Sequence, residues 1–123
     1  MDPNKKHILA VDDDPVMLKL MNEHLHGLYE VASAINGKVA LKFLETHTPD
    51  LILLDYEMPG LSGPELLAII RKDSSKENIP VIFMTGASDN DRIAALLSMK
   101  PQGYLTKPVD KELLLDKVKE LIG

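Results

Sequence analysis

The chain has 123 residues, of which 45% are apolar and 27% charged, values that predict one globular domain over residues 1–123. It contains no cysteine, which excludes disulfides, thiolate zinc sites and cysteine nucleophiles and suits the cytoplasm, where we expect the chain to act. The net charge of -5 argues against direct binding to nucleic acid or anionic lipid, and no apolar run approaches the ~20 residues that a membrane-spanning helix needs.

Five short apolar segments are candidate strands. In chain order they are Ile8–Val11, Tyr29–Ala32, Leu51–Leu54, Val81–Met84 and Tyr104–Leu105. The first, third and fourth are apolar without alternation, which is typical of parallel strands that are covered on both faces. The other two are shorter or carry a polar residue, so we expect them to flank the other three in the sheet.

A stretch with helical spacing follows each candidate strand. The predicted helix starts are Asp14-Pro15, Asn36-Gly37, the capping-box pattern Ser62 to Glu65, Ser88 to Asp91, and Asp110. The apolar residues at helical spacing extend to Leu28 in the first helix and begin at Val39 in the second. Strands that alternate with helices predict an α/β domain with a parallel sheet and helices on both sides.

Polar residues follow four of the candidate strands. They are Asp12-Asp13-Asp14 after the first, Asp55 after the third, Thr85 after the fourth, and Thr106-Lys107 after the fifth. Since the carboxyl ends of parallel strands lie at one edge of the sheet, we expect these groups to gather there. Clustered carboxylates repel one another unless a cation is present, and an all-oxygen set without Cys or His suits Mg²⁺.

This set of groups is suited to phosphoryl transfer, in which a protein mainly aligns the reactants and neutralises charge. A carboxylate can be the acceptor and form an aspartyl phosphate. An ammonium such as Lys107 and a hydroxyl such as Thr85 can contact the phosphoryl oxygens. These residue types and their order along the chain leave several of the aspartates as candidates for the acceptor.

The motifs closely resemble those of the receiver domains of two-component response regulators, over essentially the whole chain. They are Val11-Asp12-Asp13, Leu51 to Pro59, Gly63, Pro80 to Gly86, and Tyr104 to Pro108. The resemblance implies a flavodoxin-like, doubly wound, five-stranded parallel sheet with strand order 2-1-3-4-5 and five helices. It also implies a phosphorelay function, in which a sensor histidine kinase or a histidine phosphotransfer protein donates the phosphoryl group.

The resemblance makes Asp55 the phosphoacceptor. Asp12, Asp13 and Asp55 would bind Mg²⁺, or Mn²⁺ in its place, together with the backbone carbonyl of Glu57. The peptide bond between Lys107 and Pro108 would be the cis bond of the family, which proline makes accessible.

The resemblance also implies a switch. Thr85 and Lys107 would contact the phosphoryl group, and Thr85 and Tyr104 would move, which would change the face made by the fourth helix, fifth strand and fifth helix. That face would control a downstream protein or self-dimerisation. The side chains of Glu57 and Ala87 would influence the lifetime of the acyl phosphate. The chain would catalyse only its own phosphorylation and dephosphorylation and would not be an enzyme acting on other substrates.

Two alternative functions and one departure from the family pattern remain. Asp12 to Val16 fits a motif of haloacid-dehalogenase-like phosphatases, but that reading leaves Asp55 unexplained and lacks an acidic pair after Lys107. A phosphorylation-independent interaction module is the third reading, against which the intact set of polar residues argues. Lys100-Pro101 departs from the sequence that many receivers have here, and we expect a distorted end of the fourth helix.

Overall fold

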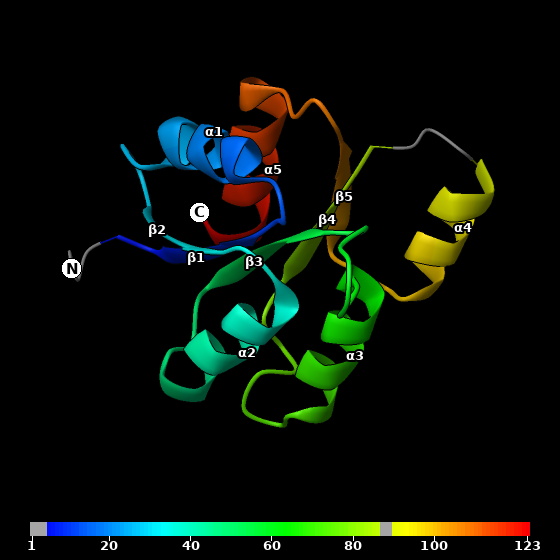
Figure 1. Ribbon diagram of the computed structural model, residues 1–123. Helices are drawn as coiled ribbons and strands as arrows, with labels where there is room; N and C mark the ends of the chain where they lie inside the picture. Colours follow the sequence, from blue (N-terminus) through cyan, green and yellow to red (C-terminus); the bar gives the residue numbers. More distant parts are fainter. Residues whose placement is uncertain (1–4, 87–89) are drawn as a thin grey trace.

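Strands and helices alternate along the chain in the computed structural model, which describes residues 5–86 and 90–123 (Figure 1). The elements are β1 (His7–Val11), α1 (Pro15–Leu25), β2 (Glu30–Ala34), α2 (Gly37–Thr46), β3 (Leu51–Asp55), α3 (Gly63–Lys72), β4 (Val81–Thr85), α4 (Asn90–Ser98), β5 (Gly103–Thr106) and α5 (Lys111–Ile122). The strands pair in parallel in the order β2-β1-β3-β4-β5. The flavodoxin-like fold expected from the sequence is therefore confirmed.

The sheet is covered on both faces, which explains why its central strands are apolar without alternation. In Figure 1, α1 and α5 lie on one side of the sheet and α2 and α3 on the other. In β3, Ile52 and Leu54 pack on the side of α2 and α3, whereas Leu51 and Leu53 pack on the side of α1 and α5. Leu96 of α4 is buried with the first group. Within the described residues, no helix combines the length and apolar character needed to cross a bilayer.

The expectation that the first helix extends to Leu28 is wrong. Leu28 is 51% exposed, because α1 ends at Leu25 and the backbone N–H groups of Leu28 and Tyr29 both donate to the Leu25 carbonyl, at 3.0 and 2.9 Å. This turn buries Tyr29 before the strand, so β2 runs over Glu30–Ala34 and ends two residues later than expected. Val39 lies in α2 as expected, and its side chain is 45% exposed.

Side-chain caps begin α1 and α3 at residues that the sequence indicates. Asp14 Oδ1 accepts a hydrogen bond from the Val16 N–H at 2.9 Å, and Pro15 follows as the first helical residue. Ser62 and Glu65 form a reciprocal capping box, with hydrogen bonds of 3.1 and 3.3 Å. The start expected for the fourth helix at Ser88 lies outside the described residues.

The end of α4 shows how Pro101 is accommodated. After Ser98 the N–H groups of Met99 and Lys100 donate to carbonyls three residues earlier, at 3.2 and 3.0 Å, which tightens the last turn. Lys100 then adopts a φ of 57°, a left-handed conformation that is unfavourable for a residue with a Cβ atom. The chain therefore leaves the helix before Pro101.

Gly63 allows the start of α3 to approach the end of β3. Its N–H donates to the Tyr56 carbonyl at 3.3 Å. A Cβ atom at this position would overlap the backbone carbonyl oxygen of Asp55 and lie 3.0 Å from the Cα atom of Tyr56. The absence of a side chain at Gly63 therefore helps to position the loop that follows Asp55.

Candidate functional site

The carboxyl ends of the strands meet at one edge of the sheet and bring together polar residues that are far apart in the sequence. They are Asp12 and Asp13 after β1, Asp55 at the end of β3, Thr85 at the end of β4, and Lys107 after β5. The side chains of the three aspartates and of Lys107 converge there. Asp14 differs from its two neighbours, since it caps α1.

Three aspartates form the acidic part of this site. One carboxylate oxygen from each of Asp12, Asp13 and Asp55 lies within 4.8 Å of the other two. Asp12 is fully buried and Asp55 is 3% exposed, whereas Asp13 is exposed to solvent. Buried carboxylates this close together are unfavourable unless a cation compensates their charge.

Lys107 supplies positive charge to the site. Its Nζ atom lies 3.0 Å from Asp12 Oδ2 and 3.2 Å from Asp55 Oδ1, and its side chain is 22% exposed. The Lys107 N–H donates to the Thr85 carbonyl at 2.8 Å, and the peptide bond to Pro108 is cis. The backbone after β5 is therefore tied to the end of β4, with the ammonium group directed at the carboxylates.

The burial of these charges changes their ionisation. The pKa of Asp55 is raised from 3.8 to about 7, first because the carboxyl group is buried and second because Asp12 lies beside it, while Lys107 opposes the rise. Burial by itself lowers the pKa of Lys107, but its contact with Asp12 and the charges of Asp12 and Asp55 outweigh burial and raise that pKa. Lys107 is therefore charged at neutral pH, whereas Asp55 is only partly ionised.

Asp12 carries one oxygen whose hydrogen-bonding capacity is not met. Its Oδ1 atom accepts from the Asp14 N–H at 2.9 Å. Its Oδ2 atom is buried and accepts no well-oriented hydrogen bond from any described residue, although Lys107 Nζ lies 3.0 Å away. A hard cation would satisfy such an oxygen, and the all-carboxylate donor set with Asp13 and Asp55 fits Mg²⁺ or Mn²⁺.

The residues predicted to act in switching lie on the two neighbouring strands β4 and β5. Thr85 is buried at the carboxyl end of β4. Tyr104 pairs with Phe83 across the two strands, is half-buried, and packs on the side of α2 and α3. Of the two residues predicted to influence acyl-phosphate lifetime, Glu57 is exposed and its N–H donates to Asp55 Oδ1 at 3.3 Å, while Ala87 lies outside the described residues.

A cavity of about 570 Å³ adjoins the acidic site. Its lining is Asp13, Tyr56, Glu57, Met58, Pro59, Ser62 and Pro64. The sequence indicated Ser62 and Pro64 only as a helix start and missed their place beside the site. The short spacing between Asp55 and the capping box is the signal that could have revealed it, because a helix starting so soon must border the strand end.

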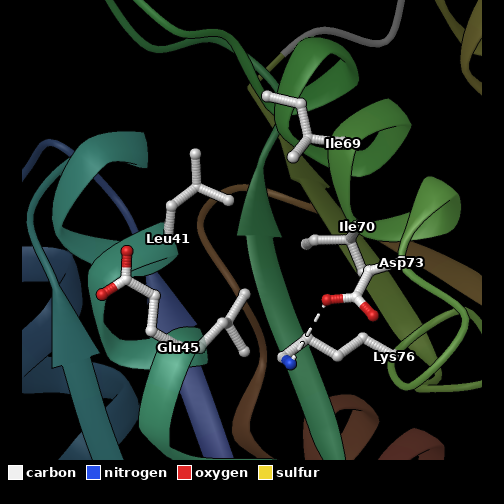
Figure 2. Close-up of a pocket in the computed structure, with 7 residues that line it drawn as sticks. Leu41, Glu45, Ile69, Ile70, Asp73 and Lys76 are labelled. Carbon is white, nitrogen blue, oxygen red and sulfur yellow. Dashed lines mark hydrogen bonds and ion pairs between the residues drawn. The ribbon is translucent and has the colours of Figure 1, made fainter.

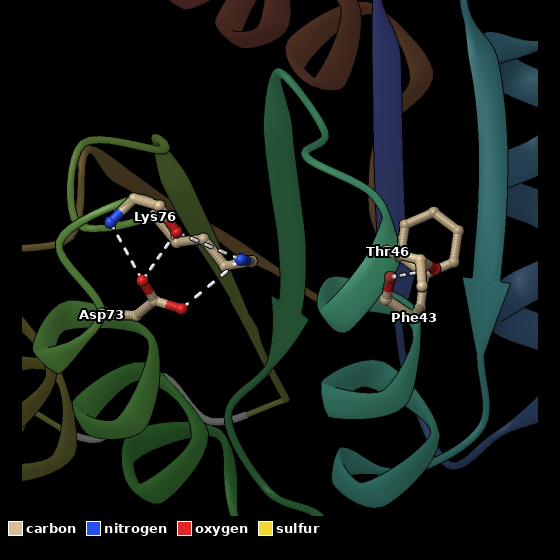
Figure 3. A network of polar contacts seen from close by, with 5 residues as sticks. Phe43, Thr46, Asp73 and Lys76 are labelled. Atoms are coloured by element: carbon tan, nitrogen blue, oxygen red, sulfur yellow. Dashed lines mark hydrogen bonds and ion pairs between the residues drawn. The ribbon is translucent and has the colours of Figure 1, made fainter.

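A second cavity, of about 220 Å³, lies between α2 and α3 and shares no lining residue with the acidic site (Figure 2). At its edge, Asp73 is the C-cap of α3 and accepts hydrogen bonds from the N–H and hydroxyl groups of Ser75, at 2.9 and 2.6 Å. Lys76 Nζ lies 3.4 Å from Asp73 Oδ2, as Figure 3 shows. The hydrogen bonds from Ser75 and the contact with Lys76 lower the pKa of Asp73. This polar network stabilises the turn after α3.

Comparisons with known proteins agree on one family. The family described as the response regulator receiver domain matches residues 8–119. The chain is 39% identical over 111 residues to a probable cyclic di-GMP phosphodiesterase of Vibrio cholerae, covering 90% of this chain but 25% of that protein. It is 30% identical over 116 residues to the chemotaxis protein CheY of Pseudomonas aeruginosa, covering 93% of this chain and 94% of that protein. The chain therefore spans about a quarter of the first relative and nearly all of the second.

Solved structures of receiver proteins have the same fold. The chemotaxis protein CheY4 of Vibrio cholerae superimposes with a TM-score of 0.89 at 26% identity, covering 96% of this chain and 99% of that one. The receiver domain of the Francisella response regulator 1452 superimposes with a TM-score of 0.86 at 30% identity, covering 95% and 96% of the two chains.

Proposed function

The chain belongs to the response regulator receiver domain family, and we propose that it accepts a phosphoryl group on Asp55. The donor is a phosphohistidine of a sensor histidine kinase or of a histidine phosphotransfer protein. One observation carries the proposal: Asp55 is a buried carboxylate that lies 3.2 Å from Lys107 and belongs to a cluster with Asp12 and Asp13. The position of Asp55 in the motif Leu51 to Pro59 favours it as the acceptor over its neighbours.

The reaction requires a divalent cation, Mg²⁺ or in its place Mn²⁺. The side chains of Asp12, Asp13 and Asp55 and the backbone carbonyl of Glu57 would hold it. The buried Asp12 Oδ2 atom, which accepts no well-oriented hydrogen bond from the described residues, supports this assignment. When bound, the cation neutralises charge on the carboxylates and on the phosphoryl oxygens.

In the transfer, an oxygen of Asp55 forms a bond to phosphorus while the bond from phosphorus to the donor imidazole nitrogen breaks. The Lys107 ammonium group, now 3.2 Å from Asp55 Oδ1, would contact one phosphoryl oxygen, and the Thr85 hydroxyl would contact another. The ionised carboxylate is the nucleophile. Because the pKa of Asp55 is about 7 without a cation, a bound cation would favour the reactive form.

Phosphorylation would then change the surface made by α4, β5 and α5. The contact between Thr85 and the phosphoryl group would draw the end of β4 toward Asp55, and Tyr104 on the adjacent strand would turn inward. Tyr104 is half-buried against the sheet, so a small shift of its strand neighbours can change its environment. The changed surface would bind a downstream protein or a second copy of the chain.

Water ends the signal by hydrolysing the acyl phosphate, and the side chains of Glu57 and Ala87 would influence that rate. The chain would therefore catalyse only its own phosphorylation and dephosphorylation.

A haloacid-dehalogenase-like phosphatase would instead need Asp14 as a second catalytic carboxylate. Asp14 caps α1 through a 2.9 Å hydrogen bond with the Val16 N–H, which disfavours that alternative.

Intact-mass analysis after incubation with Mg²⁺ and phosphoramidate tests the proposal. We expect one added phosphoryl group in the wild-type chain and none in Asp55→Asn or after chelation of the metal. Asp116→Asn, an exposed change on α5, is the matched control and should be labelled like the wild type. Labelling that persists in Asp55→Asn would contradict the assignment of the acceptor.

A further inference from the structure

β5 contains Tyr104 and leads directly to Lys107, yet among the described residues it is the shortest strand of the sheet. It is four residues long and lies at an edge of the sheet, where β4 is its one partner within the described part of the chain. The strained Lys100 and Pro101, which has no N–H to donate, precede it. The amino end of β5 therefore needs hydrogen bonds in addition to the main-chain ladder between β4 and β5.

Gln102 forms hydrogen bonds to β4 with both its main chain and its side chain. Its N–H donates to the Val81 carbonyl at 2.9 Å, and its side-chain Oε1 atom accepts from the Val81 N–H at 2.7 Å. The same Oε1 atom accepts from Arg71 Nη2 at 3.0 Å. Because both neighbours of this atom can only donate, it must be the amide oxygen. Gln102 thus binds both polar groups of the first residue of β4.

Arg71 connects this contact to α3 and to the turn before β4. Its Nη1 atom donates to the Ile79 carbonyl at 2.9 Å, while Nη2 reaches Gln102. Burial lowers the pKa of Arg71, so its guanidinium group is partly desolvated and depends on these acceptors. Val81 is fully buried, so loss of the Gln102 oxygen would leave its N–H without an acceptor.

From this geometry we infer that Gln102 and Arg71 are positioning residues for Lys107. They hold β5 against β4 at the amino end of both strands, and the Lys107 N–H holds it at the carboxyl end through the Thr85 carbonyl, at 2.8 Å. Asp12 and Asp13 follow β1 and Asp55 is the last residue of β3, and no hydrogen bond among the described residues joins Gln102 to either strand. We call the hydrogen bonds that join Gln102 to Val81 and Arg71 the clamp. The clamp therefore determines the position of the Lys107 ammonium group and does not position the three carboxylates. The inference rests on the proposed function of Asp55.

The test separates metal binding from phosphoryl transfer. Gln102→Met keeps the length of the side chain and removes the acceptor, while Gln102→Glu keeps an acceptor oxygen for Val81 and Arg71. Measured by calorimetry, the Mg²⁺ affinity of both variants should not fall, because the ligands lie on other strands and displacement of Lys107 in Gln102→Met removes a competing positive charge from beside Asp12 and Asp55. The rate of labelling by phosphoramidate at saturating Mg²⁺ should fall roughly tenfold in Gln102→Met and recover in Gln102→Glu, because displacement of Lys107 slows the transfer.

Arg71→Met removes the second partner and should slow labelling in the same direction. Lys72→Met, which removes the same charge from an exposed neighbour, is its control and should leave the rate unchanged. Equal rates in Gln102→Met and the wild type would overturn the inference, as would a fall in Mg²⁺ affinity that matches the fall in rate.

A second measurement does not depend on phosphorylation. Amide hydrogen exchange should accelerate at Val81 and across Gly103–Thr106 in Gln102→Met, but not in β1 or β3. Exchange that stays at the wild-type rate in β5 would refute the clamp even if the wild-type chain accepted no phosphoryl group. If Gln102→Met shows this exchange pattern but the wild-type chain accepts no phosphoryl group from phosphoramidate, the proposed function is refuted and the clamp is not.

Discussion

Replacing Asp55 by Asn should stabilise the metal-free protein at neutral and alkaline pH. Asp55 is 3% exposed and lies beside the buried Asp12, and the carboxyl pKa of about 7 means that the fold opposes ionisation of this group. An amide has nearly the same shape and no charge, so it resembles the protonated carboxyl group. The variant therefore removes an electrostatic cost that the wild type carries for function.

The pKa of Asp55 sets the size of the expected gain in the free energy of unfolding. The pKa of Asp55 rises from 3.8 to about 7, and a tenfold change in proton affinity is equivalent to about 1.4 kcal/mol, so full ionisation of Asp55 destabilises the fold by about 4 kcal/mol at most. Water that enters the open side of the site reduces this figure. We expect the free energy of unfolding of Asp55→Asn to exceed that of the wild type by about 2–4 kcal/mol above pH 7 or so.

The stability difference between Asp55→Asn and the wild type should depend on pH. Below about pH 4 the carboxyl group is protonated in both the folded and unfolded chains, so it contributes no difference there. Between about pH 4 and pH 7 only the folded chain holds the proton, and the wild type loses stability as the pH rises. Above the folded pKa of about 7, the advantage of Asp55→Asn should reach a constant value.

Urea unfolding in the presence of a chelator, measured from acid to alkaline pH, checks this prediction. Asp116→Asn on the exposed side of α5 is the control, and its stability should follow that of the wild type at every pH. Added Mg²⁺ should stabilise the wild type more than Asp55→Asn and narrow the difference. A variant that is less stable than the wild type at about pH 8, or a difference that does not change with pH, would refute the reasoning.

Four further predictions follow from particular contacts. Lys107→Met should raise the pKa of the phosphoacceptor carboxyl group above 7 or so, because the ammonium group opposes the rise; carboxyl NMR titration without metal would measure it, and an unchanged pKa would argue against the contact. Gly63→Ala should lower the free energy of unfolding by about 1–3 kcal/mol in urea, because the new methyl group meets backbone atoms; a neutral change would show that the loop adjusts freely. Lys100→Gly should raise the same free energy by about 1 kcal/mol, since glycine relieves the positive φ, and a loss of stability would contradict that explanation. Glu57→Ala and Ala87→Glu should each change the rate of acyl-phosphate hydrolysis, followed by loss of the added mass; two unchanged rates would remove both residues from the proposed control of lifetime.

Sequence patterns predicted those elements whose formation depends on burial of a continuous apolar run or on hydrogen bonds between neighbouring residues. β3 is recognisable because both faces of the sheet are covered, which requires an uninterrupted apolar run from Leu51 to Leu54. The capping box at Ser62 is likewise a local feature, since its hydrogen bonds join residues three apart. The same local reasoning failed at Leu28, where the turn that ends α1 depends on how the chain enters β2.

The candidate site, like the fold, was predictable from the sequence only in part. The sequence by itself determined which polar residues follow the strands, and parallel pairing then requires that Asp12, Asp55 and Lys107 share an edge. Only the tertiary structure decided that Lys107 contacts both Asp12 and Asp55, that Asp13 is exposed while Asp12 is buried, and that the pKa of Asp55 is raised. Burial and contact depend on strand order and on the helices packed around the site.

Gln102 shows the limit of the local pattern most clearly. In the sequence it is one polar residue after a proline, and nothing nearby indicates a partner. In the folded chain its amide oxygen joins Val81, which is 21 positions away, to Arg71, which is 31 positions away. Hydrogen bonds between such distant residues exist only after the sheet and α3 have packed together, because packing alone brings their donors and acceptors within reach.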